Sequence, residues 1–253
     1  MAVEIDLSGR VALVTGGTKG VGRGIAQRLA DAGATVAVCA RHEPEAPLPD
    51  GWHFVAADLR DADQAAAAVD AVVERLGRID VAVNNAGGSP PADSATVSAR
   101  FTERIIALNL LAALYVAQRA NHYMQQGDGG SIVNITSVTG TRPAPTTLAY
   151  GAAKAGLINA TMTMGMEWAP KVRVNSICVG LAQTELSHLH YGDEAGLARV
   201  AATVPAGRLA RPSEVGDVAV WLASPYASYV TGANIFAHGG GEPPAYLTAA
   251  HSD

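Results

Sequence analysis

Charged residues are scarce in this sequence, cysteine is nearly absent, and no apolar run is long enough to cross a membrane. Asp, Glu, Lys and Arg make up 16% of the 253 residues, against a typical ~25%. An unusual share of the chain is therefore expected to be buried, some of it by partner subunits. With 49% hydrophobic residues, the composition excludes a disordered, collagen-like or coiled-coil protein. Cys39 and Cys178 make no disulfide framework, and no apolar run reaches the ~18 residues of a transmembrane helix.

The charge that is present is mildly acidic. The formal net charge is −5 and the pI is about 5.8, which argues against nucleic acid or an anionic membrane surface as a partner. The segment Met1–Asp6 is acidic and lacks the basic-then-apolar order of a signal peptide. We expect a cytoplasmic protein.

Short apolar runs alternate with longer helical stretches along the whole chain. The expected strands are Arg10–Thr15, Thr35–Cys39, Trp52–Ala57, Ile79–Asn84, Ser131–Thr136, Val172–Cys178 and Ala233–Ala237. The expected helices are Val21–Ala32, Ala62–Leu76, Phe101–Gln126, Ala149–Ala169 and Ser213–Leu222. This alternation predicts an α/β fold: a doubly wound, Rossmann-type parallel sheet of seven strands with helices on both faces. No repeat or linker divides it, so residues 1–253 are expected to form a single domain.

Three segments depart from the alternation. His42–Gly51 holds three prolines and predicts a surface loop. Gln183–Arg211 is polar and interrupted by glycine, and it leaves the sixth strand at the edge where such sheets bind ligands, so it is a candidate substrate lid. No cysteine or third histidine lies near its His188 and His190 in the sequence, and no metal site is predicted. The tail Glu242–Asp253 is equally consistent with order and disorder.

A glycine-rich turn joins the first strand to the first helix at Thr15–Gly22. Gly16 permits a sharp turn, Gly20 lets backbone N–H groups approach a pyrophosphate, and Gly22 allows close contact between helix and strand. The helix N-terminus then faces the anion with unpaired donors and a favourable dipole. The turn therefore predicts a dinucleotide-binding site.

The residues after the second strand bear on the choice of nucleotide. Arg41 stands where an acidic residue would bind a ribose 2′-hydroxyl, and Lys19 in the turn can reach the same region. We expect NADP(H) to be preferred, with NAD(H) possible; the alternative is that both are ordinary surface cations. Asp58, after the third strand, suits an acceptor for the adenine amino group or a cap of the next helix.

Tyr150 and Lys154 lie four residues apart and so share one face of a helix. A nearby ammonium lowers a tyrosine pKa by favouring phenolate, which would make the proton exchangeable during turnover. Ser137 ends the fifth strand at the same edge as the glycine turn, where its hydroxyl could bind a substrate carbonyl oxygen. The three residues together predict a reacting centre.

With these motifs the chain resembles the short-chain dehydrogenase/reductase family from about Leu7 to Gly240. The motifs that carry the resemblance are the turn Thr15–Gly22, Asn84-Asn85-Ala86-Gly87, Asn109, Ser137, and Tyr150-Gly-Ala-Ala-Lys154. The resemblance implies a tetrad: Tyr150 as acid/base, Ser137 polarising the substrate, Lys154 holding the nicotinamide ribose, and Asn109 fixing a water beside Lys154. Without it, Asn109 would be read only as a polar residue bending an apolar helix.

Further contacts follow for the cofactor and the substrate. The residues expected at the cofactor are Gly16, Thr18, Lys19, Gly20, Val21, Arg41, Asp58, Leu59, Asn85, Ala86, Gly87, Tyr150, Lys154, Gly180, Ala182 and Thr184. Those expected at the substrate are Ser89, Ser137, Thr139, Tyr150 and Leu181. One departure affects this site: Val179 replaces the proline that the family usually has beside the nicotinamide. His238 also replaces a residue that is often acidic, and the sequence suggests no function for that change.

These residues favour an oxidoreductase that moves hydride between NADP(H) and a secondary alcohol or ketone of a small, neutral or apolar substrate. A 3-oxoacyl-(acyl carrier protein) reductase is an alternative, but the segment Asn121–Asp128 offers no basic docking patch for an acidic carrier. A non-catalytic nucleotide sensor or scaffold is another. The apolar residues of Phe101–Gln126 cover most of that helix, which predicts a homo-oligomer; the family resemblance narrows this to a homotetramer.

Overall fold

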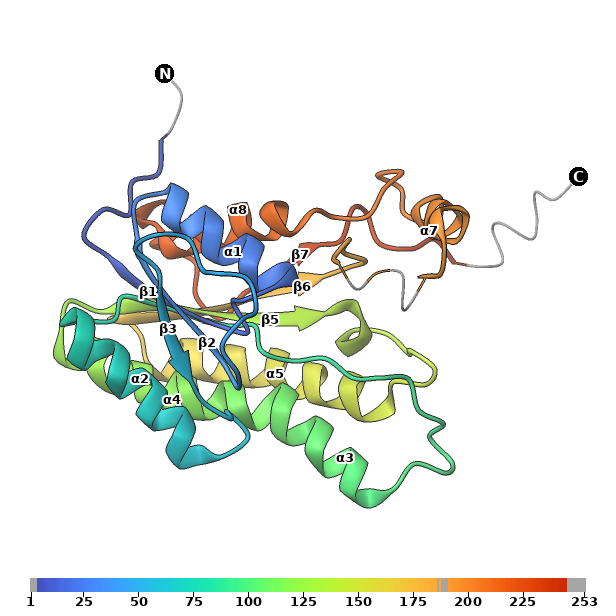
Figure 1. Cartoon of the computed structure of the whole chain (residues 1–253), viewed down its shortest axis with the longest axis horizontal. Helices are drawn as coiled ribbons and strands as arrows, with labels where there is room; N and C mark the ends of the chain where they lie inside the picture. Colours follow the sequence, from blue (N-terminus) through green and yellow to red (C-terminus); the bar gives the residue numbers. More distant parts are fainter. Residues whose placement is uncertain (1–3, 186, 188–190, 245–253) are drawn as a thin grey trace, which may run out of the picture.

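Seven parallel strands form one sheet at the centre of the molecule (Figure 1). The computed structural model describes residues 4–185, 187 and 191–244. The strands are β1 (Val11–Thr15), β2 (Thr35–Ala40), β3 (His53–Ala56), β4 (Val81–Asn84), β5 (Gly130–Ser137), β6 (Val172–Val179) and β7 (Asn234–Ala237). Their order is β3-β2-β1-β4-β5-β6-β7. The chain winds outward in both directions from β1 and β4, so ligands are expected beyond the carboxyl ends of these two strands.

Helices cover both faces of the sheet, which confirms the predicted architecture. They are α1 (Gly20–Asp31), α2 (Ala62–Leu76), α3 (Ala99–Ile106), α4 (Ala112–Gln126), α5 (Leu148–Glu167), α7 (Glu194–Ala201) and α8 (Pro212–Ala223). α1 and α8 lie on one face, and α2, α4 and α5 lie on the other (Figure 1). Across the described part of the chain, no helix has the length and apolar character needed to cross a membrane.

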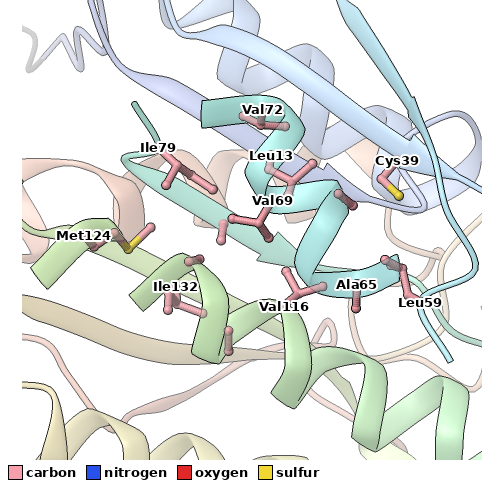
Figure 2. Close-up of a cluster of buried hydrophobic side chains, with 14 of the residues drawn as sticks. Leu13, Cys39, Leu59, Ala65, Val69, Val72, Ile79, Val116, Met124 and Ile132 are labelled. Carbon is pink, nitrogen blue, oxygen red and sulfur yellow. The ribbon is translucent and has the colours of Figure 1, made fainter. Parts of the chain in front are cut away.

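The hydrophobic core consists of two layers, one on each face of the sheet. Successive side chains of a strand point to opposite faces, so the neighbours Leu13 and Val14 belong to different layers. Figure 2 shows the layer of Leu13, where Val69 of α2 and Ile132 of β5 pack together. Both faces of the strands are therefore buried, which explains why their sequences are continuous apolar runs.

Both cysteines are buried in this core. Cys39 and Cys178 have no exposed surface, as expected for small residues that fill the ends of strands. Burial raises the pKa of the Cys39 thiol to about 12 and also raises that of Cys178.

Glycine allows α1 and α8 to pack closely. A Cβ atom at Gly24 would lie 2.4 Å from Pro212 Cβ, and one at Gly216 would lie 2.8 Å from the Gly24 carbonyl oxygen. We expect Gly24→Val to lower the free energy of unfolding by about 3 kcal/mol, because the two helices must separate. Urea denaturation measures this. Gln27→Val, at an exposed position of the same helix, controls for the helix propensity of valine; equal losses in both variants would contradict the packing argument.

The helix predicted over Phe101–Gln126 is three segments, α3, a π-helical turn at Ala107–Leu111, and α4. Asn109 lies in this turn, and its side-chain amide donates to the Ile105 carbonyl at 2.9 Å. The side chain thereby competes for the acceptor that an α-helical N–H would use, and the backbone widens to the longer spacing. The other predicted helices and strands agree with the structure to within one or two residues at each end.

The segments outside the alternation also follow the prediction in part. His42–Gly51 contains no helix or strand. Gln183–Arg211 leaves β6 and returns beside it, where Gln183 N–H donates to the Ala210 carbonyl and Ala210 N–H to the Leu181 carbonyl, both at 2.9 Å. Helix α7 lies within this segment and is not predicted from the sequence. His188 and His190 lie outside the described residues, and a lid function stays a prediction.

Candidate active site

The turn between β1 and α1 is formed by glycines whose backbone leaves no room for side chains. Gly16 and Gly20 have φ angles of +63° and +54°, which glycine adopts at no steric cost. A Cβ at Gly22 would lie 2.3 Å from the Gly16 carbonyl oxygen. The N-cap residue Lys19 supplies no side-chain hydrogen bond to the described helix α1. The first N–H groups of α1 are therefore available to an anion.

A cavity of about 350 Å³ extends from this turn to the end of β5. It is lined by Gly16, Lys19, Gly20, Val21, Gly22, Asn85, Ala86, Gly87, Gly88, Ile135, Thr136, Ser137, Tyr150, Lys154, Val179, Gly180, Ala182, Thr184 and Glu185. The cavity thus joins the predicted phosphate turn to three members of the predicted tetrad. Sequence reasoning missed Glu185, since nothing in the polar segment after β6 singles it out.

The loop after β4 is fastened to β1 by a threonine that sequence reasoning also missed. The Thr15 hydroxyl oxygen accepts from the backbone N–H groups of Asn85 and Ala86, both at 3.0 Å. In return, the Asn85 side chain donates to the Thr15 and Gly16 carbonyls at 2.9 and 3.2 Å. A threonine that ends a buried strand is not by itself a signal, because these contacts join residues 70 positions apart in the sequence.

Tyr150 and Lys154 lie one turn apart on α5 and face Ser137 at the end of β5. The Lys154 Nζ atom is 5.6 Å from the centre of the Tyr150 ring and donates to the Ile135 carbonyl at 2.8 Å. The Ser137 hydroxyl accepts from the Thr139 N–H at 3.3 Å. The spacing in sequence therefore does place the ammonium, the phenol and the hydroxyl around one cavity.

Burial dominates the electrostatics of this pair. It lowers the pKa of Lys154, which is 3% exposed, to about 8. It also raises the pKa of Tyr150, and a hydrogen bond with Ser137 opposes that rise only partly. The expected lowering of the Tyr150 pKa by Lys154 is thus not found in this structure: desolvation is the largest cause and raises the pKa, while the ammonium donates to the Ile135 carbonyl.

Asn109 contacts the backbone of the cofactor-side loop. Its side-chain carbonyl accepts from Gly88 N–H at 2.7 Å, and its amide donates to the Gly88 carbonyl at 3.0 Å. A Cβ at Gly87 would lie 2.6 Å from Asn109 Oδ1 and 3.4 Å from Lys154 Nζ. Asn109 therefore fixes the loop beside Lys154, while its predicted contact with a water stays a prediction.

The turn with the unusual Val179 is supported by His238. Val179 and Gly180 line the cavity, and a Cβ at Gly180 would lie 2.8 Å from His238 Cα. Gly180 N–H also donates to the Ala237 carbonyl at 3.1 Å. Packing against β7 and His238 thus constrains this turn without the ring of a proline.

Arg41 and Asp58 line a second cavity, of about 380 Å³, beyond the ends of β2 and β3. Asp58 is bound by Arg60, a residue that sequence reasoning missed. The helix that follows is capped by Asp61, which accepts from Asp63 and Gln64 N–H at 3.0 Å, so the capping alternative for Asp58 is wrong.

The remaining predicted residues lie near these cavities without lining either one in the described part of the chain. They are Thr18, Leu59, Ser89, Asn109, Thr139 and Leu181. Leu59 has its side chain in the core (Figure 2), which leaves its backbone for a cofactor contact. The Ser89 hydroxyl donates to the Pro90 carbonyl at 2.8 Å. The hydroxyl of Thr139 is buried with no hydrogen-bond partner among the described residues.

The loop between Ser137 and Tyr150 is joined to the C-terminal segment by an ion pair between Arg142 and Glu242. Glu242 also helps to raise the pKa of Tyr191, a residue of the predicted lid, although burial is the larger cause. Three segments of the chain therefore meet at this point. Nothing in the sequence predicts this ion pair, because the two residues are 100 positions apart.

The donors and spaces of the first cavity fit a nicotinamide dinucleotide. The glycine turn with the α1 N-terminus suits a pyrophosphate, and the side chains of Tyr150 and Lys154 provide polar groups for a ribose. The second cavity offers a guanidinium at the end of β2.

Comparison with known proteins identifies the family. The model of a family described as enoyl-(acyl carrier protein) reductase matches residues 16–242. The 2-dehydro-3-deoxy-D-gluconate 5-dehydrogenase of Escherichia coli (strain K12) is 34% identical over 93% of this chain and 96% of its own. The 3-oxoacyl-(acyl-carrier-protein) reductase of Vibrio harveyi is 34% identical over 93% of this chain and 98% of its own. The chain belongs to the short-chain dehydrogenase/reductase family.

A solved structure agrees in fold. Gluconate 5-dehydrogenase from Burkholderia cenocepacia J2315, in complex with NADP and tartrate, is 30% identical and covers 94% of this chain and 96% of its own, with a TM-score of 0.87. The chain is accordingly an oxidoreductase acting on CH–OH or C=O groups.

Proposed function

We propose that the protein transfers hydride between NADP(H) and the carbon of a secondary alcohol or ketone in a small molecule. The observation that carries this proposal is the single cavity that holds the α1 glycine turn together with Ser137, Tyr150 and Lys154. The nicotinamide, when bound, supplies or accepts the hydride. The protein's own groups then act on the oxygen atom of the substrate.

Tyr150 is the proposed acid/base. In the direction of reduction, its hydroxyl donates a proton to the substrate oxygen; in oxidation, its phenolate takes the proton of the alcohol. The Ser137 hydroxyl donates a hydrogen bond to the same oxygen and stabilises the negative charge that develops there. Lys154 holds the ribose, and its ammonium favours the phenolate of Tyr150 once it is no longer directed only at Ile135.

The preference for NADP(H) rests on Arg41. We expect NADPH to bind more tightly than NADH, and Arg41→Ala to weaken NADPH binding by about tenfold or more while NADH binding changes little, because only NADPH offers a phosphate for a charge-assisted hydrogen bond. Fluorescence titration measures both affinities. Arg104→Ala, an exposed arginine of α3, is the control. Tighter binding of NADH by the unaltered protein would refute the preference.

Reduction of a 3-oxoacyl group on acyl carrier protein is the second candidate, favoured by the description of the matching family model and by the Vibrio harveyi relative. We rank a small molecule above it. The segment Asn121–Asp128, which precedes β5, contains no lysine or arginine and so offers an acidic carrier no basic docking patch. Saturable turnover of a 3-oxoacyl carrier substrate, faster than that of small ketones, would reverse the ranking.

The proposed assembly is a homotetramer. Large apolar side chains stay exposed on the isolated chain, among them Met166 of α5 at 84%, Tyr229 at 103% and Phe236 of β7 at 51%. Such side chains on two separate elements suit two different subunit contacts. Sedimentation at micromolar concentration should give about four times the chain mass of 25.9 kDa. A peak at the mass of one chain would exclude the assembly.

A further inference from the structure

The second cavity is built from the ends of two neighbouring strands. β2 and β3 pair with Ala40 beside Ala56, and Ala57 N–H continues the ladder to the Ala40 carbonyl at 3.0 Å. The residues that line it are Arg41, His42, Ala56, Ala57, Asp58, Arg60 and Gln64. The glycine turn is attached to the same edge, because Gly16 N–H donates to the Cys39 carbonyl at 2.7 Å. The charged groups of the cavity are thus fixed relative to the proposed phosphate turn.

Asp58 is engaged by Arg60 through most of its acceptor positions. The Arg60 Nε donates to both carboxylate oxygens, at 2.8 and 3.2 Å, and Nη2 forms a further contact with Oδ2. The backbone N–H of Arg60 also donates to Oδ1, at 3.2 Å. The hydrogen bond from the Arg60 side chain is the main cause that holds the pKa of Asp58 at about 2. The carboxylate is therefore ionised at neutral pH, and Arg60 is its counter-charge.

Arg41 stands beside this pair without joining it. Within residues 4–185, 187 and 191–244, its side chain forms no ion pair and no side-chain hydrogen bond. It is nevertheless close enough for its charge to lower the pKa of Asp58. Counting His42 as neutral, the cavity holds two guanidinium groups and one carboxylate. Without Arg60, Asp58 would have Arg41 as its nearest cation, and the charges of the cavity would cancel.

We propose that Arg60 is a positioning residue that determines nucleotide specificity: by holding Asp58, it leaves Arg41 free for the 2′-phosphate of NADP(H). The proposal rests on the proposed preference for NADP(H) and adds a residue outside the glycine turn and the end of β2. A carboxylate has about four acceptor positions, and only three N–H groups of Arg60 engage Asp58, because Nε–H is shared between both oxygens. An acceptor position is thus left for an adenine amino group. The pair thereby separates base recognition from phosphate recognition.

Binding of nucleotide fragments tests this without any need for turnover. Adenosine 2′,5′-bisphosphate and 5′-AMP differ only in the 2′-phosphate, so the ratio of their dissociation constants, measured by calorimetry, isolates recognition of that group. We expect the unaltered protein to favour the bisphosphate, and Arg60→Leu to reduce the ratio by about tenfold, since the freed Asp58 carboxylate would then neutralise the charge of Arg41. Asp58→Asn is expected to raise the ratio.

The double variant Asp58→Asn/Arg60→Leu provides the sharpest outcome. Its cavity regains a net charge of +1 with Arg41 free, so the ratio should return to within about twofold of the unaltered protein. Arg119→Leu is the matched control, because the pair Arg119–Asp70 has side-chain exposures of 33% and 30% against 32% and 30% for Arg60–Asp58. It should leave the ratio unchanged. Melting temperatures confirm that each variant is folded.

The possible failures are distinct. If the unaltered protein binds the two fragments equally, the preference for NADP(H) is wrong, and this inference is wrong with it. If it favours the bisphosphate but Arg60→Leu keeps the same ratio, only the role of Arg60 is overturned. A double variant that binds like Arg60→Leu alone would also overturn it, because the loss could not then come from the freed charge of Asp58.

Discussion

Tyr150→Phe is expected to lower kcat by about 10²- to 10⁴-fold, because the variant has no group to exchange a proton with the substrate oxygen. The affinity for NADPH should stay within about twofold, since the ring and its packing on α5 are preserved. Initial rates with a ketone substrate and a fluorescence titration measure the two quantities on one preparation. The expected result is a folded protein that binds cofactor and does not turn over.

A second tyrosine supplies the control for this variant. Tyr123 lies on α4, where its hydroxyl donates to Asp70 at 2.9 Å and accepts from Arg119 at 3.1 Å, so Tyr123→Phe also removes one hydroxyl together with its hydrogen bonds. Its kcat should be that of the unaltered protein. Substantial turnover by Tyr150→Phe would mean that another group moves the proton or that the protein works without turnover as a nucleotide sensor.

Lys154→Met is expected to abolish most turnover and yet stabilise the protein at pH 7 by about 2 kcal/mol. Burial lowers the pKa of Lys154 from 10.5 to about 8, so the charged form of this side chain costs roughly 3 kcal/mol at neutral pH. The variant removes that cost. It also leaves the Ile135 carbonyl without its donor, which lowers the stability of the folded protein by about 1 kcal/mol. For a chain of this length, a rise in Tm of about 5 °C is expected.

The pH dependence of the stability difference between the two proteins tests whether the buried charge causes it. Between pH 8 and 10.5 the unfolded chain keeps the Lys154 proton while the folded protein has released it, so the unaltered protein gains stability as the pH rises. The methionine variant lacks this titration. The excess in its free energy of unfolding over that of the unaltered protein, measured by urea denaturation, should therefore be smaller at pH 9.5 than at pH 7. An advantage that is constant with pH would point to better packing alone, and an absent one would contradict the buried charge.

The sheet could be predicted because each strand is recognisable from its own short run of apolar residues. Leu13 and Val14 are consecutive and both fully buried. Consecutive residues of a strand point to opposite faces, so an uninterrupted apolar run indicates a strand that is covered on both faces. The same holds for the end of β6, where Ile177 and Cys178 are buried on opposite faces. The parallel direction of the strands then followed from their alternation with helices.

The π-helical turn could not be predicted in the same way. Apolar periodicity runs through Phe101–Gln126 without interruption, and the turn arises where the Asn109 side chain takes the Ile105 carbonyl as an acceptor while it also contacts Gly88, 21 residues away. The direction in which the Tyr150 pKa shifts could not be predicted from the sequence either, because it depends on how deeply the phenol is buried. Spacing showed which groups meet, but their solvation is a property of the folded cavity.

The sequence predicts two of the three charged residues at the second cavity. It predicts nucleotide contacts for Arg41 and Asp58 and none for Arg60. The signal was present, since Arg60 is only two positions from Asp58. It was weak because an arginine before a helix is usually a solvated surface residue. Only the geometry shows that its guanidinium lies against the carboxylate.

The burial of both thiols makes the protein convenient for spectroscopy. Cys39 and Cys178 have no exposed surface and raised pKa values, so alkylating dyes should not label the unaltered chain. A cysteine introduced at the exposed Ala195 of α7 would then take up a single fluorophore. Its emission would report whether the segment after β6 changes position when nucleotide and substrate are added, in a protein that needs no prior removal of its own cysteines.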